Sequence, residues 1–305
     1  MNKFDLIMTQ SEKGGSGKST VKQAVIAGLL AGGARVLVVD ADDGNSGYIR
    51  RAGVGSAIPL SWTTGTDAMD GWLAKHLGDH DTLAVDCGAN IIASGAQVNE
   101  FLGELVLRAG ASGGKVIALA VASTNAPGTG RLARQMRDAY GDYADVRLIQ
   151  NDQDGSAAFS RSLATLGMPT ATFPHIRPGV QAARLLTVAP LLDVLRAPPS
   201  GYETAMAIYA EVVASFMAEA AVRDLFSDEA LNHVRALSEK APGDLSRVVL
   251  ELRHATNAAI AGNRALLIAR RELRKAAADR SDLSSIGRAA LKWLDADVAY
   301  LSLIR

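Results

Sequence analysis

Residues 12–20 constrain this chain more than any other part of its sequence. They read Glu-Lys-Gly-Gly-Ser-Gly-Lys-Ser-Thr, between a short apolar run at 4–9 and a helix-forming run at 21–30. A strand, a glycine-rich loop with Gly-Lys-Ser/Thr and a helix predict a phosphate-binding loop, because small residues let consecutive backbone N–H groups converge on an anion. Lys18 adds a point charge at the helix start, and the Ser19 hydroxyl can reach Mg²⁺. The stretch therefore predicts nucleotide binding.

Length and composition narrow the class of protein further. The chain has 305 residues, 48% of them hydrophobic, with 32 Lys plus Arg against 32 Asp plus Glu. This allows one large α/β domain with an added module, and the zero net charge favours neither nucleic-acid nor membrane binding overall. The single cysteine, Cys87, excludes an intrachain disulfide and fits a reducing compartment. With no apolar run near the roughly 20 residues of a membrane span and no signal peptide expected, a cytoplasmic location is predicted.

Apolar strand-like runs alternate with helices along the first part of the chain. These runs are expected at 35–40, 82–86, 115–121, 146–150 and 170–173. The alternation predicts a doubly wound, mostly parallel sheet of the P-loop NTPase type, with helices on both faces. The segment 53–71 has little periodicity and is expected to be an irregular excursion. It is either a partner-binding segment or a loop packed by its own aromatic residues.

Acidic residues follow two of these strands. Asp40 and Asp42 end the strand at 35–40, and Asp86 ends the strand at 82–86. Since ligands bind at the carboxyl ends of strands in parallel sheets, these carboxylates are expected beside the phosphate loop. Alone, they could be solvated turns. Next to a phosphate loop they favour a metal site, in which Asp86 binds Mg²⁺ through a water.

The loop with its second lysine, Lys13, resembles the deviant phosphate loop of the ParA/MinD superfamily of ATPases. The resemblance implies an ATPase with ATP and Mg²⁺ as ligands, in which Lys13 reaches the nucleotide of a second subunit. It also implies that Asp42 orients the attacking water and that Asp40 supports Mg²⁺ together with Ser19 and Asp86. The implied phosphate-contacting residues are Gly14, Gly15, Ser16, Gly17, Lys18, Ser19 and Thr20.

Two later segments complete the implied nucleotide site. Asn151 follows the strand at 146–150 and resembles the family's base-recognition position, where a side-chain amide pairs with adenine. Asp154 is a weaker candidate for the same role. Pro174 resembles the turn that packs beside the base. The neighbouring His175 could contact the base, but a solvated turn histidine is the favoured interpretation.

The sequence changes character after residue 220. Apolar residues then recur at helical spacing without strand-like runs, so residues 1–220 are expected to form the ATPase domain and residues 221–305 an all-helical C-terminal module. Three arginines give the helix expected at 130–140 a basic face. That face is expected to be solvated, with DNA or lipid phosphate as the alternative. Cys87 is expected to be a small buried residue and not a nucleophile.

The resemblance implies a function as well as a fold. It implies a slow ATPase that forms an ATP-dependent homodimer, is stimulated by a protein partner, and positions, segregates or transfers DNA, directly or through a DNA-binding adaptor. The segments after Asp42 and Asp86 look more like the TraL/StbB-type proteins of plasmid conjugation and stability than like plasmid partition ATPases. Two alternatives stay open: a P-loop metabolic synthetase or kinase, and an adaptor whose oligomeric state is set by ATP.

Overall fold

The computed structural model describes residues 3–42, 55–89, 91–124, 130–185, 187–200 and 202–239. By its internal contacts the chain divides into two units, Met1–Ala241 and Pro242–Arg305. The described residues all belong to the first unit. The C-terminal part of the predicted helical module therefore lies outside the described residues.

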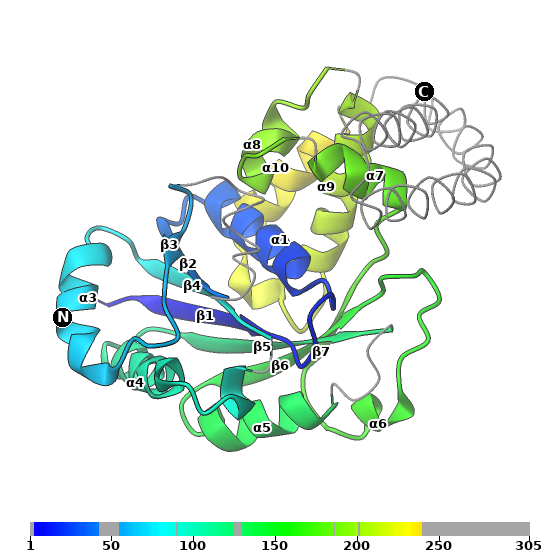
Figure 1. Cartoon of the computed structure of the whole chain (residues 1–305). Helices are drawn as coiled ribbons and strands as arrows, with labels where there is room; N and C mark the ends of the chain where they lie inside the picture. Colours follow the sequence, from blue (N-terminus) through cyan, green and yellow to red (C-terminus); the bar gives the residue numbers. More distant parts are fainter. Residues whose placement is uncertain are drawn as a thin grey trace, which may run out of the picture. The chain divides into compact units, whose positions relative to one another are not determined.

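Seven parallel strands form one sheet in the first unit (Figure 1). They are β1 (Asp5–Gln10), β2 (Val36–Ala41), β3 (Ile58–Pro59), β4 (Thr82–Cys87), β5 (Val116–Ser123), β6 (Asp145–Asn151) and β7 (Thr170–Phe173). Their order is β3-β2-β4-β1-β5-β6-β7, and every neighbouring pair is parallel. The predicted parallel sheet is confirmed. β1 is the central strand, so the loop after it opens where ligands bind in such folds.

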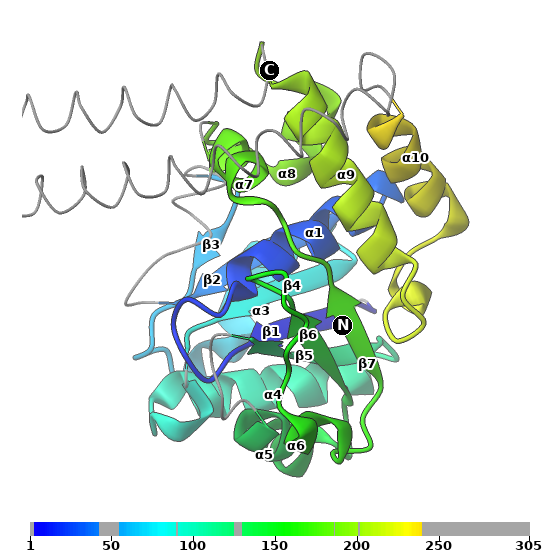
Figure 2. The same cartoon turned by 90° about the vertical axis from the view of Figure 1, so that its right-hand side faces the viewer.

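Helices cover both faces of the sheet, as Figures 1 and 2 show. One face carries α1 (Lys18–Ala31), α7 (Pro178–Leu185), α8 (Leu191–Arg196), α9 (Glu203–Met217) and α10 (Asp228–Ser238). The other carries α3 (Met69–His76), α4 (Gln97–Ala111), α5 (Gly130–Tyr140) and α6 (Arg161–Ala164). Successive residues of β1 point to opposite faces of the sheet. Leu6 and Met8 pack toward α4, and Ile7 packs toward α1. Burying each such side chain contributes about 1.5–3 kcal/mol.

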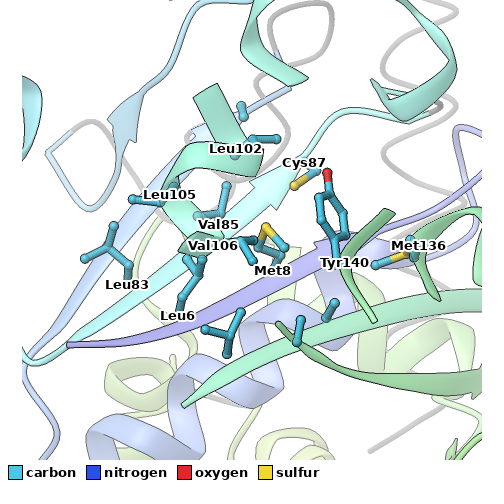
Figure 3. Packing of buried hydrophobic residues seen from close by; sticks show 14 of the residues in the cluster. Leu6, Met8, Leu83, Val85, Cys87, Leu102, Leu105, Val106, Met136 and Tyr140 are labelled. Carbon is cyan, nitrogen blue, oxygen red and sulfur yellow. The ribbon is translucent and has the colours of Figure 1, made fainter. Parts of the chain in front are cut away.

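The layer under α4 also encloses the single cysteine. Figure 3 shows Leu6 and Met8 of β1 with Val85 of β4 and Leu105 of α4 in this cluster. Cys87 belongs to the same cluster and is fully buried. Burial raises the pKa of its thiol to about 12, so the thiol is protonated at neutral pH. The structure thus agrees with the expectation of a small buried residue and not a nucleophile.

The segment expected to be irregular is partly ordered. Its described part contains β3, which pairs with β2 through Val39 opposite Ile58 and Asp40 opposite Pro59. A 3₁₀ helix (Thr66–Ala68) then leads into α3. A two-residue strand contains no periodicity, so the sequence could not reveal it.

The sequence predicts that residues 221–305 form the C-terminal module, whereas the structure places α10 in the first unit. It packs on α1 and α9. Just before it, the ring of Phe226 comes so close to Gly28 of α1 that a Cβ there would lie 2.6 Å from the ring. Helical periodicity alone does not say which neighbour a helix packs against, which explains the difference.

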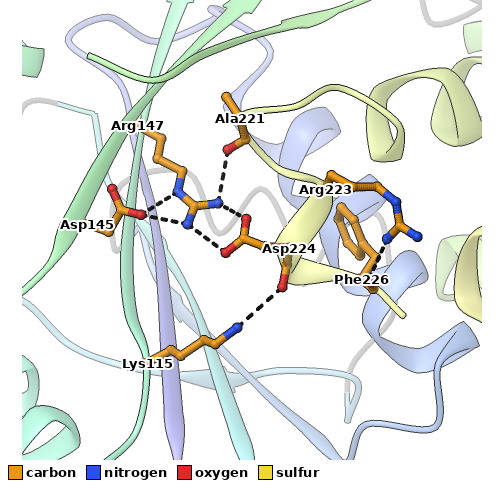
Figure 4. Close-up of polar contacts among 7 residues, drawn as sticks. All are labelled: Lys115, Asp145, Arg147, Ala221, Arg223, Asp224 and Phe226. Atoms are coloured by element: carbon orange, nitrogen blue, oxygen red, sulfur yellow. Dashed lines mark hydrogen bonds and ion pairs between the residues drawn. The ribbon is translucent and has the colours of Figure 1, made fainter. Parts of the chain in front are cut away.

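A buried arginine ties the connection between α9 and α10 to the sheet (Figure 4). The Arg147 guanidinium on β6 donates to both carboxylate oxygens of Asp224, at 2.5 and 2.9 Å, and to Asp145 at 2.6 Å. It also donates to the Ala221 carbonyl at 3.0 Å. Lys115 Nζ donates to the Asp224 carbonyl at 3.4 Å. These hydrogen bonds hold residues 221–224, which connect α9 to α10, against the sheet. They thereby help to position α10 on α1.

Candidate nucleotide site

The glycine-rich loop connects β1 to α1 and has the backbone shape of an anion-binding loop. Gly15 and Gly17 have φ angles of +84° and +78°, a region that favours glycine. Gly17 caps α1, and its carbonyl accepts the N–H of Thr20 at 2.9 Å and of Val21 at 3.1 Å. The first N–H groups of α1 thus lie at the carboxyl edge of the sheet, where they can bind phosphate.

The end of β6 holds this loop from one side. Asn151 Nδ2 donates to the Ser16 carbonyl at 2.7 Å, and Gln153 Nε2 donates to the Gly15 carbonyl at 2.8 Å. Gln153 is itself held by the Ser123 hydroxyl at 2.6 Å. The predicted base-site residue Asn151 therefore contacts the phosphate loop directly. The sequence does not predict this contact of Gln153. The only indication in the sequence is that Gln153 lies two residues after Asn151.

Replacing Gly17 by alanine should weaken nucleotide binding about tenfold or more and cost about 1–2 kcal/mol of folding stability. A Cβ at this position would lie 2.0 Å from Asn151 Nδ2, in addition to the strain of its φ. Titration calorimetry and thermal unfolding would measure the two effects. Gly33→Ala is the matched control, because Gly33 has φ +82° but open space around its Cβ position. Equal effects of the two substitutions on nucleotide binding would contradict this account.

On the other side of the loop, the predicted lysine, serine and acidic residues come together. Lys18 Nζ lies 2.6 Å from Asp86 Oδ1 and 3.7 Å from Asp42 Oδ2. The Ser19 hydroxyl donates to Asp86 Oδ2 at 3.1 Å. Asp40 is the register partner of Asp86 across β2 and β4, and its Oδ1 accepts the Asp42 N–H at 3.0 Å. The parallel register of β2 and β4 thus brings Asp40 next to Asp86. Together with Asp42, these residues form one acidic cluster.

Two buried ammonium groups face this acidic cluster. Burial lowers the pKa of Lys18, but the charge and hydrogen bond of Asp86 outweigh burial and leave the pKa above its usual 10.5. Lys22, one turn further along α1, is almost completely buried and donates to the Val39 carbonyl at 2.9 Å. Burial lowers the pKa of Lys22 to about 8, although Asp86 and Asp40 oppose the shift. The sequence does not predict that Lys22 belongs to the site. The only indication in the sequence is that Lys22 follows Lys18 by four residues, which places both on one face of a helix.

The donor set fits Mg²⁺. Ser19, Asp40 and Asp86 offer oxygen atoms, which this ion prefers, and Mg²⁺ typically binds one or two carboxylates together with waters and substrate phosphates. Across the described residues no group of three or more His, Cys, Asp or Glu side chains could hold a metal ion alone. The remaining ligands would therefore come from phosphate and water.

Two charged residues, Glu12 and Lys13, lie at the start of the phosphate loop, and only Glu12 forms an ion pair among the described residues. Lys13 is exposed, and none of its described neighbours forms an ion pair with its ammonium group. Glu12, where phosphate loops usually have glycine, pairs through Oε1 with Arg131 Nη2 of α5 at 2.9 Å. One arginine of the predicted basic face is therefore bound to the loop.

A cavity of about 280 Å³ lies beside the loop at the ends of β6 and β7. It is lined by Gly17, Thr20, Asn151, Asp152, Gln153, Phe173, Ile176 and Gln181. Ligand pockets usually measure about 300–1,000 Å³, so this one suits a group the size of a base. Of the predicted base-site residues, Asn151 lines the cavity. Pro174 is half-buried next to it, while Asp154 is exposed and hydrogen-bonded to Ser156 at 2.6 Å. His175 Nδ1 lies 3.3 Å from the Asp152 carbonyl.

The parallel sheet, the loop after its central strand and the acidic cluster define a P-loop NTPase. The model of the family "ATPase MipZ" matches residues 5–52, which contain β1, the loop, α1 and β2. This local match supports the resemblance of residues 5–52 to P-loop ATPases of the ParA/MinD superfamily, which the sequence predicts. The TraL/StbB-type branch stays a prediction.

Several solved structures are similar to this chain. A ParA family ATPase from Chlorobium tepidum TLS is 15% identical, with a TM-score of 0.43, over 66% of this chain and 94% of that one. The chloroplast FtsY of Physcomitrella patens is 15% identical, with a TM-score of 0.35, over 52% of each chain. The FtsY of Mycoplasma mycoides is 16% identical, with a TM-score of 0.32, over 49% of this chain and 52% of that one. No curated protein sequence matches the chain.

Among the described residues, no helix is long and apolar enough to span a membrane.

Proposed function

We propose that this chain is an ATP-dependent dimerisation switch with slow, partner-stimulated hydrolysis, and that it positions, segregates or transfers DNA in the cytoplasm. The observation that carries the proposal is the contrast between the two lysines of the loop. Lys18 is buried against Asp86, whereas Lys13 is exposed, with its ammonium unpaired among the described residues. An exposed cation at the mouth of a phosphate site is available to a nucleotide bound by a second copy of the chain.

Within one subunit, the residues divide the chemistry between them. The loop amides and Lys18 hold the phosphates, and Lys18 exchanges its contact with Asp86 for one with the nucleotide. Asp86, Asp40 and Ser19 would hold Mg²⁺, which would neutralise charge on the phosphates. Asp42, near Lys18, orients the attacking water for in-line displacement. The cavity beside Asn151 takes the adenine base.

The solution mass of the protein tests the switch. With Mg²⁺-ATP the wild-type chain should form dimers that Mg²⁺-ADP does not support, and Lys13→Ala should weaken this dimerisation at least about tenfold. Lys75→Ala is the matched control, because Lys75 is an exposed lysine on α3, away from the loop. Light scattering across a concentration series would measure the dissociation constants. A mass that ignores the nucleotide would contradict the switch.

The turnover rate separates this function from its alternatives. Hydrolysis stimulated by DNA or by a protein partner supports the proposal. Binding of ATP that changes the oligomeric state without any stimulated turnover supports the adaptor. Transfer of phosphate to a small molecule supports the metabolic enzyme.

A further inference from the structure

Trp62 lies between the two strand ends that carry the acidic cluster. It follows β3, which is fixed to the end of β2 through the Leu60 N–H and the Asp40 carbonyl at 2.8 Å. Its indole Nε1 donates to the carbonyl of Ala41 at 2.7 Å. The same carbonyl accepts the N–H of Gly88 at 3.2 Å. One oxygen atom thus joins Trp62, the end of β2 and the segment after β4.

The Ala41 carbonyl belongs to the peptide bond that precedes Asp42. The N–H of this peptide donates to Asp40 Oδ1 at 3.0 Å, so both of its polar groups are held. A peptide plane held at both ends cannot rotate freely, and its orientation sets where the Asp42 side chain begins. The carboxylate of Asp42 lies 3.7 Å from Lys18 Nζ in this arrangement.

The Trp62 ring also packs directly on Gly88. A Cβ at Gly88 would lie 2.6 Å from the indole Cζ2, and the φ of this glycine is not in the left-handed region. Glycine is therefore required here for the close approach of the ring and not for its backbone conformation. The Trp62 carbonyl, in turn, accepts the Val98 N–H at the start of α4 at 3.2 Å. Trp62 thus contacts the end of β2 and the segment after β4 through its indole, and the start of α4 through its backbone carbonyl.

We propose that Trp62 is a positioning residue for hydrolysis: its indole fixes the peptide bond before Asp42 against the segment that follows Asp86. The proposal rests on the proposed role of Asp42 in orienting water. On this proposal Trp62 acts through Asp42 and not through a contact with the nucleotide. Its removal should therefore slow hydrolysis without weakening nucleotide binding, a pattern that a general loss of folding stability does not produce.

The test compares Trp62→Phe with Trp72→Phe. Phenylalanine keeps an aromatic ring but lacks the indole N–H, and Trp72 is the matched control because it packs on Phe101 on the same face of the sheet. Hydrogen exchange of the Asp42 and Gly88 amides is measured without nucleotide. The Kd for Mg²⁺-ATP and the kcat for phosphate release are measured at equal folded fraction.

We expect faster exchange of both amides in Trp62→Phe alone, a Kd within about twofold of wild type and a kcat lowered about tenfold. Unchanged exchange would overturn the indole contact. Faster exchange with an unchanged kcat would overturn the positioning of Asp42. If wild-type protein does not bind Mg²⁺-ATP, the proposed function fails, and hydrogen exchange still decides whether Trp62 fixes the peptide.

Discussion

Replacing Lys18 by methionine should abolish nucleotide hydrolysis and destabilise the fold at the same time. The substitution removes the charge that holds the phosphates, with an expected loss of at least about a thousandfold in kcat. It also leaves Asp86, which is completely buried, without the ammonium 2.6 Å away. Breaking such a buried pair costs about 3–5 kcal/mol, and the remaining Lys22 keeps the cost at the lower end. Phosphate release and urea unfolding measure the two losses.

The double variant Lys18→Met/Asp86→Asn separates folding from catalysis. With both members of the pair replaced, neither is left as a buried charge without its partner, so most of the lost folding stability should return. Hydrolysis should not return, since the phosphates still lack their lysine. Additive losses of stability in the single and double variants would mean that the two side chains are not coupled in the folded protein.

Replacing Arg147 by methionine should lower the free energy of unfolding by about 2–3 kcal/mol. Arg147 is almost completely buried, and its guanidinium satisfies Asp145, Asp224 and the Ala221 carbonyl. Because the Asp224 carboxylate is half exposed, water compensates part of the loss, and the full cost of a buried pair is not expected. Urea unfolding measures the change. Arg35→Met is the control, since its pair with Asp81 is exposed and should contribute less than about 1 kcal/mol.

The same substitution should change the acid sensitivity of the fold. The hydrogen bonds from Arg147 hold the pKa of Asp224 below its usual 3.8. A carboxylate with a lowered pKa stabilises the folded state fully above its unfolded pKa and loses this contribution as the pH falls through the folded value. Below pH 4, Arg147→Met should therefore lose less stability per pH unit than wild type. Equal slopes in urea unfolding between pH 5 and pH 2 would contradict the role given to the Arg147 contacts.

The sequence predicted the central features of the site because they are local motifs on parallel strands. The loop at 12–20 is contiguous, and Asp40 and Asp86 each end a clear apolar run, so their meeting follows from the sheet alone. Gln153 and Trp62 could not be predicted in this way. Their contacts depend on where β6 and β3 place them relative to the loop and to Ala41, which no local pattern records.

The buried position of Lys22 has a consequence for the electrical balance of the site. Among the described residues, the carboxylates of Asp40, Asp42 and Asp86 are opposed by the two ammonium groups of Lys18 and Lys22. When a nucleotide takes Lys18 as its own counterion, three negative charges remain with the single positive charge of Lys22. This excess of two matches the charge of one divalent cation. A divalent cation that arrives with the nucleotide would offset this excess, whereas a nucleotide alone would add its own negative charge to that of the carboxylates.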